Sequence, residues 1–218
     1  LTANISGVTS LYVIEKEISD LTGIEDFTGL TELKCQENNL SALDVSQNTG
    51  LTLLNCGRNN LTAIDVSANT ALIQLNTYDN QLTALDVSNN TAITTMWCYN
   101  NQFTALDLSA NTALTKLYVN DNALATLDLS ANTALTILQC GGNELTALDV
   151  STNTVLTTLR VPNNQLTALD VSANTALTTL YCQSNPELFC IQVADVDQAE
   201  QDWGGGISSW MGFSTDCE

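Results

Sequence analysis

The chain has no histidine and very few basic residues. Among its 218 residues, five lysines and arginines stand against 24 aspartates and glutamates, so the formal net charge is -19. The lack of histidine removes the side chain that most often serves as a general base or metal ligand near neutral pH. The acidic excess repels DNA and RNA, whose binding depends on basic residues that neutralise phosphates. We therefore expect no nucleic-acid partner.

Several sequence signatures are also missing. No apolar run approaches the roughly 20 residues that a helix needs to span a bilayer, so we expect no transmembrane segment. There is no GxSxG motif and no phosphate-binding loop. Regularly spaced, solvated carboxylates are not a catalytic pair with separated pKa values, so we do not expect an enzyme. The chain begins with Leu1 and carries no signal peptide, which predicts a processed or excised part of a longer polypeptide.

A 21-residue unit accounts for most of the chain. It reads LTxLxCxxNxLTALDVSxNTA, and its first position recurs without insertion or deletion at Leu30, Leu51, Leu72, Ile93, Leu114, Leu135, Leu156 and Leu177. A fixed period of this length indicates a solenoid, in which each coil buries its apolar side chains against its neighbours. Positions 3 to 7 alternate between apolar and polar residues, which predicts a strand. The second half of the unit repeats this spacing.

The predicted fold is therefore mostly β, with little or no helix outside the caps. We expect two short strands per coil, one on each wall, stacked into two parallel sheets with a strand spacing of about 4.8 Å. Asparagine fills position 9 in all eight units and position 19 in the seven complete ones. These side chains are expected to satisfy backbone groups at the corners of each coil, and to bond one another along the stack.

These motifs resemble a known repeat class. LxxLxCxxN resembles the leucine-rich-repeat signature, and the appended LxxLDVSxN resembles the 21-residue IRREKO type; together they cover residues 30–185. The sequence pattern LTALDVSxNTALTxLxC is also similar to modules in secreted and cell-surface proteins of flavobacteria. The resemblance implies an extracellular recognition module, often part of a longer protein.

We expect three segments. Residues 1–29 form an irregular N-terminal repeat or truncated cap, because the step from Val8 to Leu30 is 22 residues and LTANI resembles the remains of another coil. Residues 30–185 hold seven full units and a half unit. Residues 186–218 form a C-terminal cap with a short acidic helix in ADVDQAEQDW. Its aromatic residues are available to cover the last coil: Trp203, Trp210 and Phe213.

The seven cysteines fall into two groups. Cys35, Cys56, Cys98, Cys140 and Cys182 occupy position 6, where threonine and valine stand in the other units, so they are expected to be buried packing residues. The absence of a CxxC motif argues against a metal site. Cys190 and Cys217 lie outside this pattern and bracket the cap. We predict a disulfide between them, which indicates an oxidising compartment and a secreted or cell-surface protein.

The outward positions of the first strand vary most between units. Tyr78, Trp97, Tyr99 and Tyr118 fall on three consecutive coils and predict an exposed aromatic patch on the concave face, with Lys116, Arg160 and Tyr181 as further contacts. Such residues suit a protein partner, and stacked rings also suit a polysaccharide. Two alternatives are aromatic pairing that merely stabilises the sheet, and a structural spacer within a larger adhesin or enzyme.

A ladder of aspartates occupies position 15. It comprises Asp44, Asp65, Asp86, Asp107, Asp128, Asp149 and Asp170, each followed two residues later by serine. Neighbouring carboxylates repel, so something must offset their charge. One hypothesis places calcium between the coils at Asp86, Asp107 and Asp128. The favoured hypothesis is hydrogen bonding from serine or threonine hydroxyls and turn N–H groups, because the GGxGxD calcium loop is absent. We expect no cofactor.

Overall fold

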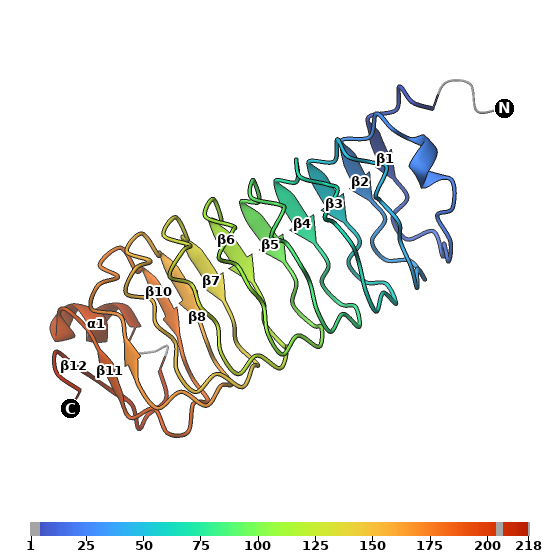
Figure 1. Ribbon diagram of the computed structural model, residues 1–218. Helices are drawn as coiled ribbons and strands as arrows, with labels where there is room; N and C mark the ends of the chain where they lie inside the picture. The colour runs from blue at the N-terminus through green and yellow to red at the C-terminus, as the bar shows by residue number, and fades with distance from the viewer. Residues whose placement is uncertain (1–4, 204–206, 218) are drawn as a thin grey trace.

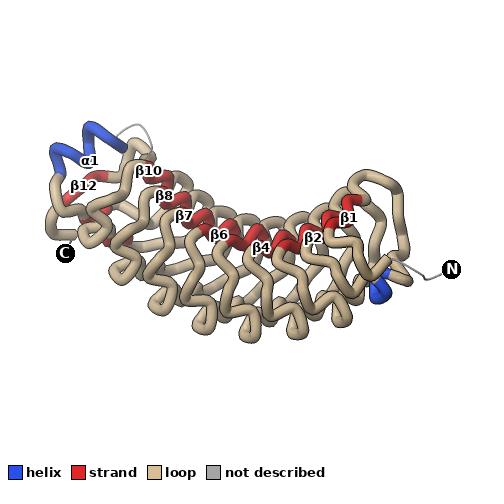
Figure 2. Tube along the Cα trace, turned by 90° about the horizontal axis from the view of Figure 1, so that it is seen from above, coloured by secondary structure: helices blue, strands red, loops and turns tan. Residues whose placement is uncertain are grey.

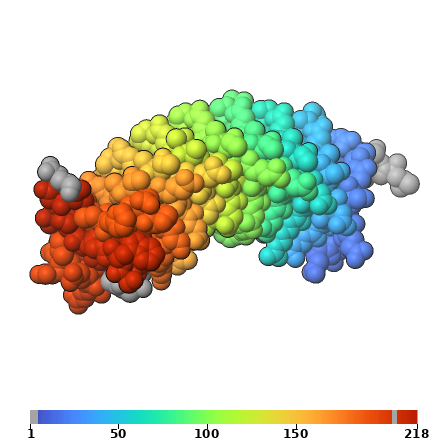
Figure 3. Space-filling model, turned by 90° about the horizontal axis from the view of Figure 1, so that it is seen from below, coloured from blue at the N-terminus to red at the C-terminus, as the bar shows by residue number. Residues whose placement is uncertain are grey.

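The computed structural model describes residues 5–203 and 207–217, which form one elongated, curved solenoid (Figure 1). The first four residues of the predicted LTANI remnant lie outside the described part. Seen from above, the stacked coils make an arc whose strands follow the concave side (Figure 2). The colours of the space-filling view succeed one another along the length, so each coil covers the next (Figure 3). The prediction of a mostly β solenoid is confirmed.

The main sheet has nine parallel strands in chain order. Each pairs with its predecessor one unit away, for example Leu117 with Leu138, whereas β1 pairs with β2 across a step of 22 residues. The middle residue of a repeat strand is buried and its neighbours face outward, as the alternation predicts. The strands are β1 (Ser10–Tyr12), β2 (Glu32–Lys34), β3 (Leu53–Asn55), β4 (Gln74–Asn76), β5 (Thr95–Trp97), β6 (Lys116–Tyr118), β7 (Ile137–Gln139), β8 (Thr158–Arg160) and β10 (Thr179–Tyr181).

The opposite wall differs from the prediction of strands on both walls. In the part of the chain that the structure describes, strands occur on this wall only at the C-terminal end, where β9 (Leu169–Asp170), β11 (Cys190–Gln192) and β12 (Gly212–Ser214) form a small sheet. Along the rest of the described wall the chain runs through turns. Since the strands follow the concave side, the coils fan apart on the convex side (Figure 2). Fewer backbone hydrogen bonds join neighbouring coils there than in the main sheet. One that remains joins the Gln81 N–H to the Leu61 carbonyl at 2.9 Å.

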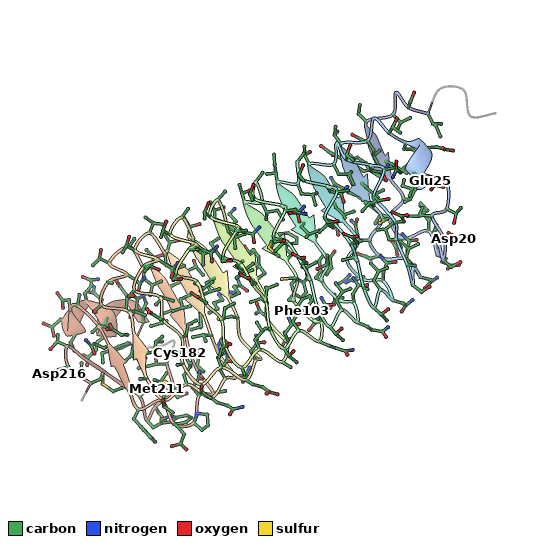
Figure 4. All side chains as sticks on the ribbon, in the orientation of Figure 1. Asp20, Glu25, Phe103, Cys182, Met211 and Asp216 are labelled. Atoms are coloured by element: carbon green, nitrogen blue, oxygen red, sulfur yellow. A yellow bond between two sulfur atoms is a disulfide. The ribbon has the colours of Figure 1, made fainter. Side chains whose placement is uncertain are left out.

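A single hydrophobic core runs along the solenoid, from Ile24 to Met211. The repeated leucines and valines fill it, and Phe103 takes the place of a leucine at position 11 without any exposed area (Figure 4). The five cysteines at position 6 are buried and unbonded, as predicted. Burial raises the pKa of the Cys98 and Cys140 thiols to about 12, so neither ionises near neutral pH.

The two asparagine ladders satisfy the backbone differently. At position 9, the Asn59 amide donates to three carbonyls, and its Oδ1 accepts the Leu40 N–H at 3.0 Å. At position 19, Asn111 donates to the carbonyls of Val87 and Asn90, but its Oδ1 has no partner among the described residues. Neither ladder bonds side chain to side chain. The predicted amide stack is therefore wrong, because these donors bond to backbone carbonyls of their own coil and of the preceding coil.

The two ends of the solenoid depart from the repeat. Near the N-terminus lies a short 3-10 helix, η1 (Ile24–Asp26), and at the C-terminus lies the predicted acidic helix, α1 (Val196–Trp203). No helix of the described chain is long and apolar enough to cross a membrane. The disulfide between Cys190 and Cys217 is present, with 5.8 Å between the Cα atoms.

Two of the three cap aromatics cover the last coil as predicted. Trp203 and Phe213 pack against the core and each other, with ring centroids 6.2 Å apart. Trp210, in contrast, is 51% exposed.

Candidate ligand-binding surface on the strand wall

The strand wall is the outward surface of β1 to β8 and β10. Positions 3, 5 and 7 of each unit supply its side chains, while positions 4 and 6 point into the core. Core positions accept only small or branched apolar residues, apart from Met96 and Thr77, because each must pack against the coils on both sides. Outward positions escape this constraint, so the variation between units is concentrated on the concave side of the solenoid.

Four side chains form a continuous aromatic cluster on this wall. Tyr78 and Tyr99 stack with ring centroids 4.9 Å apart, and Trp97 meets Tyr118 edge to face at 5.6 Å. Tyr78 and Trp97 join the two pairs at 6.4 Å. Offset or edge-on aromatic pairs at such distances stabilise a surface by about 0.5–1.5 kcal/mol each beyond their burial. The structure thus brings together the four aromatics selected from the sequence.

The cluster is less exposed than expected. Trp97, Tyr99 and Tyr118 are half-buried, and Tyr78 is only 9% exposed, so the expectation of an exposed ring is wrong for Tyr78. The cause lies one coil earlier, at Gly57. A Cβ atom at Gly57 would lie 2.5 Å from the Tyr78 ring, so the absence of a side chain at Gly57 leaves the space that the ring occupies. Burial raises the pKa of Tyr78, against the opposing effect of its hydrogen bond with Asn55.

A second glycine plays the same part further along the wall. A Cβ at Gly141 would lie 2.8 Å from the Pro162 ring, which occupies position 7 of the next unit. A glycine at position 7 followed 21 residues later by a cyclic side chain is thus a signal for a ring that packs over the glycine. The sequence interpretation overlooked this signal.

Cations and aromatics also pair at the two ends of the wall. The Arg160 guanidinium lies 5.0 Å from the Tyr181 ring centroid, and the Tyr181 ring is 41% exposed. At the other end, the Lys34 ammonium lies 4.5 Å from the ring of Tyr12, whose hydroxyl donates to Glu32. Sequence reasoning missed Tyr12, because the 22-residue step before the first regular unit hides its register with the repeat strands.

The remaining basic residues near the wall differ in their surroundings. Lys116 is exposed beside the cluster and forms no salt bridge within the described chain. Arg58 is held at the corner after β3, with 3.2 Å to both Glu37 and Asp79. This corner position adopts a left-handed backbone in every unit, with φ between 51° and 63°. Lys116 is therefore the free cation closest in sequence to the cluster, and Arg58 is already neutralised.

The aspartate ladder lies away from the strand wall and caps its own turns. The Asp107 carboxylate accepts the Ser109 N–H at 2.9 Å, and all seven aspartates make this contact. Hydrogen bonds from Ser109 hold the pKa of Asp107 below its ordinary 3.8. No group of three or more acidic or cysteine side chains in the described chain is placed to hold a metal ion. The geometry favours the hydrogen-bonding hypothesis over calcium at Asp86, Asp107 and Asp128.

These turn caps predict a specific sensitivity to acid. Since the folded pKa values of Asp86, Asp107 and Asp128 are lowered, the contribution of each to stability is complete above its unfolded pKa and is lost as pH falls through the folded value. We expect the melting temperature to decrease as the pH is lowered below about 4. In a triple variant, Asp86→Asn, Asp107→Asn and Asp128→Asn, the fall should be smaller, because asparagine accepts the same hydrogen bond without titrating. Identical pH profiles of the two proteins, followed by circular dichroism, would contradict this account.

The chain is similar in sequence and fold to several known proteins. Residues 76–101 match the LVIVD repeat family. Over 44 residues the chain is 50% identical to Internalin J of Listeria monocytogenes, a match covering 20% of this chain and 5% of that protein. The solved functional domain of InlJ, described as including a cysteine ladder, is 36% identical with a TM-score of 0.51; the match covers 87% of this chain and 54% of that one. In this chain, buried cysteines recur at position 6 of five units.

Two further solved structures share the fold. Internalin InlF of Listeria monocytogenes is 25% identical with a TM-score of 0.76, covering 100% of this chain and 63% of that chain. The leucine-rich-repeat ectodomain of the Arabidopsis thaliana receptor kinase GASSHO1/SCHENGEN3, solved in complex with CASPARIAN STRIP INTEGRITY FACTOR 2, is 22% identical with a TM-score of 0.68. That match covers 80% of this chain and 23% of the receptor chain, and identity this low shows the fold alone. The chain spans 54% and 63% of the two internalin structures.

Proposed function

Because this chain is a leucine-rich-repeat solenoid, we propose that it is a non-catalytic recognition module that binds a protein partner through the strand wall. The observation that carries this proposal is the aromatic cluster. It occupies the middle of the concave side, where the structural constraint on side chains is weakest, and the fold itself does not require aromatics there. Large, rigid rings supply contact area at little entropic cost, which is why tyrosine and tryptophan dominate binding hot spots.

The shape of the wall favours a macromolecule. Its curvature lets a partner touch several coils at once (Figure 2). Hollows of about 240, 330 and 380 Å³ lie outside the strand wall. They lie against the first coils, the C-terminal cap and the aspartate ladder, respectively. Lys116, Arg160 and Tyr181 lie toward the C-terminal side of the cluster and can orient the partner with polar contacts. The plant receptor ectodomain of the same fold was solved in complex with CASPARIAN STRIP INTEGRITY FACTOR 2.

We place this function outside the cell or at a bacterial surface. The disulfide supports an oxidising compartment. The similarity to internalins is consistent with such a location. Two predictions rest on the sequence alone. They are that the chain is part of a longer polypeptide and that it resembles flavobacterial modules.

A second candidate is a polysaccharide-binding module. The observation that favours it is the pair of half-buried rings of Tyr99 and Tyr118 on adjacent coils, since flat aromatic surfaces stack against sugar rings. A third reading, a structural spacer within a larger adhesin or enzyme, predicts no ligand at all.

Binding arrays can separate these candidates. The wild-type chain, Trp97→Ala and a control, Phe189→Ala, are applied to protein and glycan arrays; Phe189 is 59% exposed and lies outside the strand wall. We expect protein hits whose affinity falls about thirtyfold in Trp97→Ala, the size of a hot-spot loss, and stays unchanged in Phe189→Ala. Circular dichroism confirms that Trp97→Ala remains folded.

Each other outcome has a definite meaning. Protein hits that survive Trp97→Ala would remove the aromatic cluster from the site. Glycan hits alone, lost in Trp97→Ala, would assign the surface to a polysaccharide. Absence of hits on both arrays would favour the spacer.

A further inference from the structure

A cavity separate from the strand wall lies at the C-terminal cap. It opens between α1 and the last complete repeat and has a volume of about 330 Å³. Helix α1 contacts β10 and β12 and closes this end of the solenoid (Figure 1). The volume falls at the lower end of the range of small-molecule sites. We refer to this space as the cap cavity.

The inner lining of the cap cavity is apolar and firmly held. Val171, Leu177 and Val193 are each at most 5% exposed, and Trp203 lines the cavity with its ring packed against Phe213. The disulfide ties β11 to the end of the chain beyond β12. These buried apolar side chains favour a ligand with an apolar body.

The charged groups of the cap cavity are acidic, and its neutral polar lining includes Asn174, Thr178 and Gln198. Asp195 and Asp202 line it, and none of the lining residues is basic. The Asp195 carboxylate accepts the Gln198 backbone N–H at 3.1 Å, at the start of α1, where the helix dipole disfavours a cation. Asp202 belongs to the last helical turn, where the dipole favours a cation, and within the described chain its carboxylate accepts only the Gln198 side-chain amide at 2.8 Å. Asp202 is therefore the better anchor for positive charge.

The charge of the whole molecule acts in the same direction. A protein of net charge -19 repels anionic ligands and raises the local concentration of cations. The cap cavity thus combines buried apolar residues and neutral polar groups with two exposed carboxylates, of which Asp202 lies at the helix end that favours a cation. This is the complement of an ammonium group on an apolar body.

We propose that the cap cavity binds a small organic cation, a primary ammonium carried on an apolar body of about the size of one ring. The ammonium pairs with Asp202, and the body lies against Val171, Leu177 and Trp203. This site is independent of the strand wall, so the two proposals can succeed or fail separately.

Three probes of matched size test the proposal on the full chain. They are 2-phenylethylamine, neutral 2-phenylethanol and anionic 3-phenylpropionate, and binding is followed by ligand-observed NMR titration. We expect saturable binding of the amine, at least tenfold weaker binding of the alcohol and no binding of the acid. Asp202→Asn should weaken the amine at least tenfold. Asp197→Asn, an exposed change on the same helix outside the cavity, should not, and neither should Trp97→Ala.

Three outcomes would overturn the proposal. The first is the absence of saturable amine binding. The second is equal binding of the amine and the alcohol, which would mean a purely apolar pocket. The third is equal weakening by Asp197→Asn and Asp202→Asn, which would mean attraction to overall charge rather than to a site. Circular dichroism of both variants shows whether α1 is retained, so a folding defect is not mistaken for loss of the ligand contact.

Discussion

Replacing Asn59 with alanine is expected to lower the free energy of unfolding by about 3 kcal/mol, whereas replacing the adjacent Asn60 should change it by about 0.5 kcal/mol or less. The two residues have the same chemistry and neighbouring positions. They differ in burial: Asn59 is 8% exposed, and Asn60 is exposed with no side-chain hydrogen bond. Alanine also occupies the place of Asn60 in another unit, at Ala123.

The large effect of Asn59→Ala has a definite origin. Its amide donates to the carbonyls of Cys35, Cys56 and Gly57 at 3.0 to 3.1 Å. Those carbonyls keep other donors, so the loss there is partial. The Leu40 N–H is buried and has no other acceptor in the described chain. Leaving it unpaired costs about 1–3 kcal/mol in addition to the lost hydrogen bonds.

Urea denaturation and hydrogen exchange measure this effect together. The denaturation midpoint gives the overall loss, and the exchange rate of the Leu40 amide shows where it arises. Because a solenoid can open locally, we expect faster exchange at Leu40 and its neighbours than at the far end of the chain. Equal stabilities of Asn59→Ala and Asn60→Ala would refute the structural role assigned to position 9.

Breaking the disulfide is expected to destabilise the cap by about 3.5 kcal/mol, from the chain-entropy estimate for a sequence separation of 27 residues. The bond joins β11 to the end of the chain. Without it, β12 loses its covalent tie to β11, and the cover that Trp203 and Phe213 provide for the last coil is weakened. We expect α1 to melt at a lower temperature than the repeats, as a separate step.

Mild reduction tests this prediction selectively. The other five cysteines are already free thiols, so a reductant leaves them unchanged, and burial raises their pKa, which disfavours exchange with the disulfide. The double variant Cys190→Ser, Cys217→Ser should reproduce the effect. Cys140→Val serves as the control, because valine fills the same position at Val119 and Val161. An unchanged melting curve after reduction would show that the cap is held by packing alone.

The repeat period was sufficient to predict the order of the coils, the inward and outward positions and the burial of the cysteines. These properties are local: a residue in a strand alternates faces with its neighbour, and identical units must stack identically. The same reasoning found the disulfide, because Cys190 and Cys217 depart from the pattern. It also found α1, and it grouped the four aromatics, whose spacing of about one unit places them on adjacent coils.

Other features depended on contacts between coils. Whether the opposite wall carries strands is decided by curvature, which moves the coils apart on the convex side and leaves their backbones with few partners (Figure 2). Whether Tyr78 is exposed depends on Gly57, a residue one coil away. The existence of the cap cavity depends on how α1 packs against the last repeat.

The amino-acid sequence alone determined that this protein is a stack of 21-residue coils with its variation on one wall, because a fixed period forces each unit to bury the same positions. Only the tertiary structure decided how much of each aromatic ring is accessible and where hollows remain. Accessible area depends on which atoms lie over a side chain, and those atoms belong to neighbouring coils and to the cap.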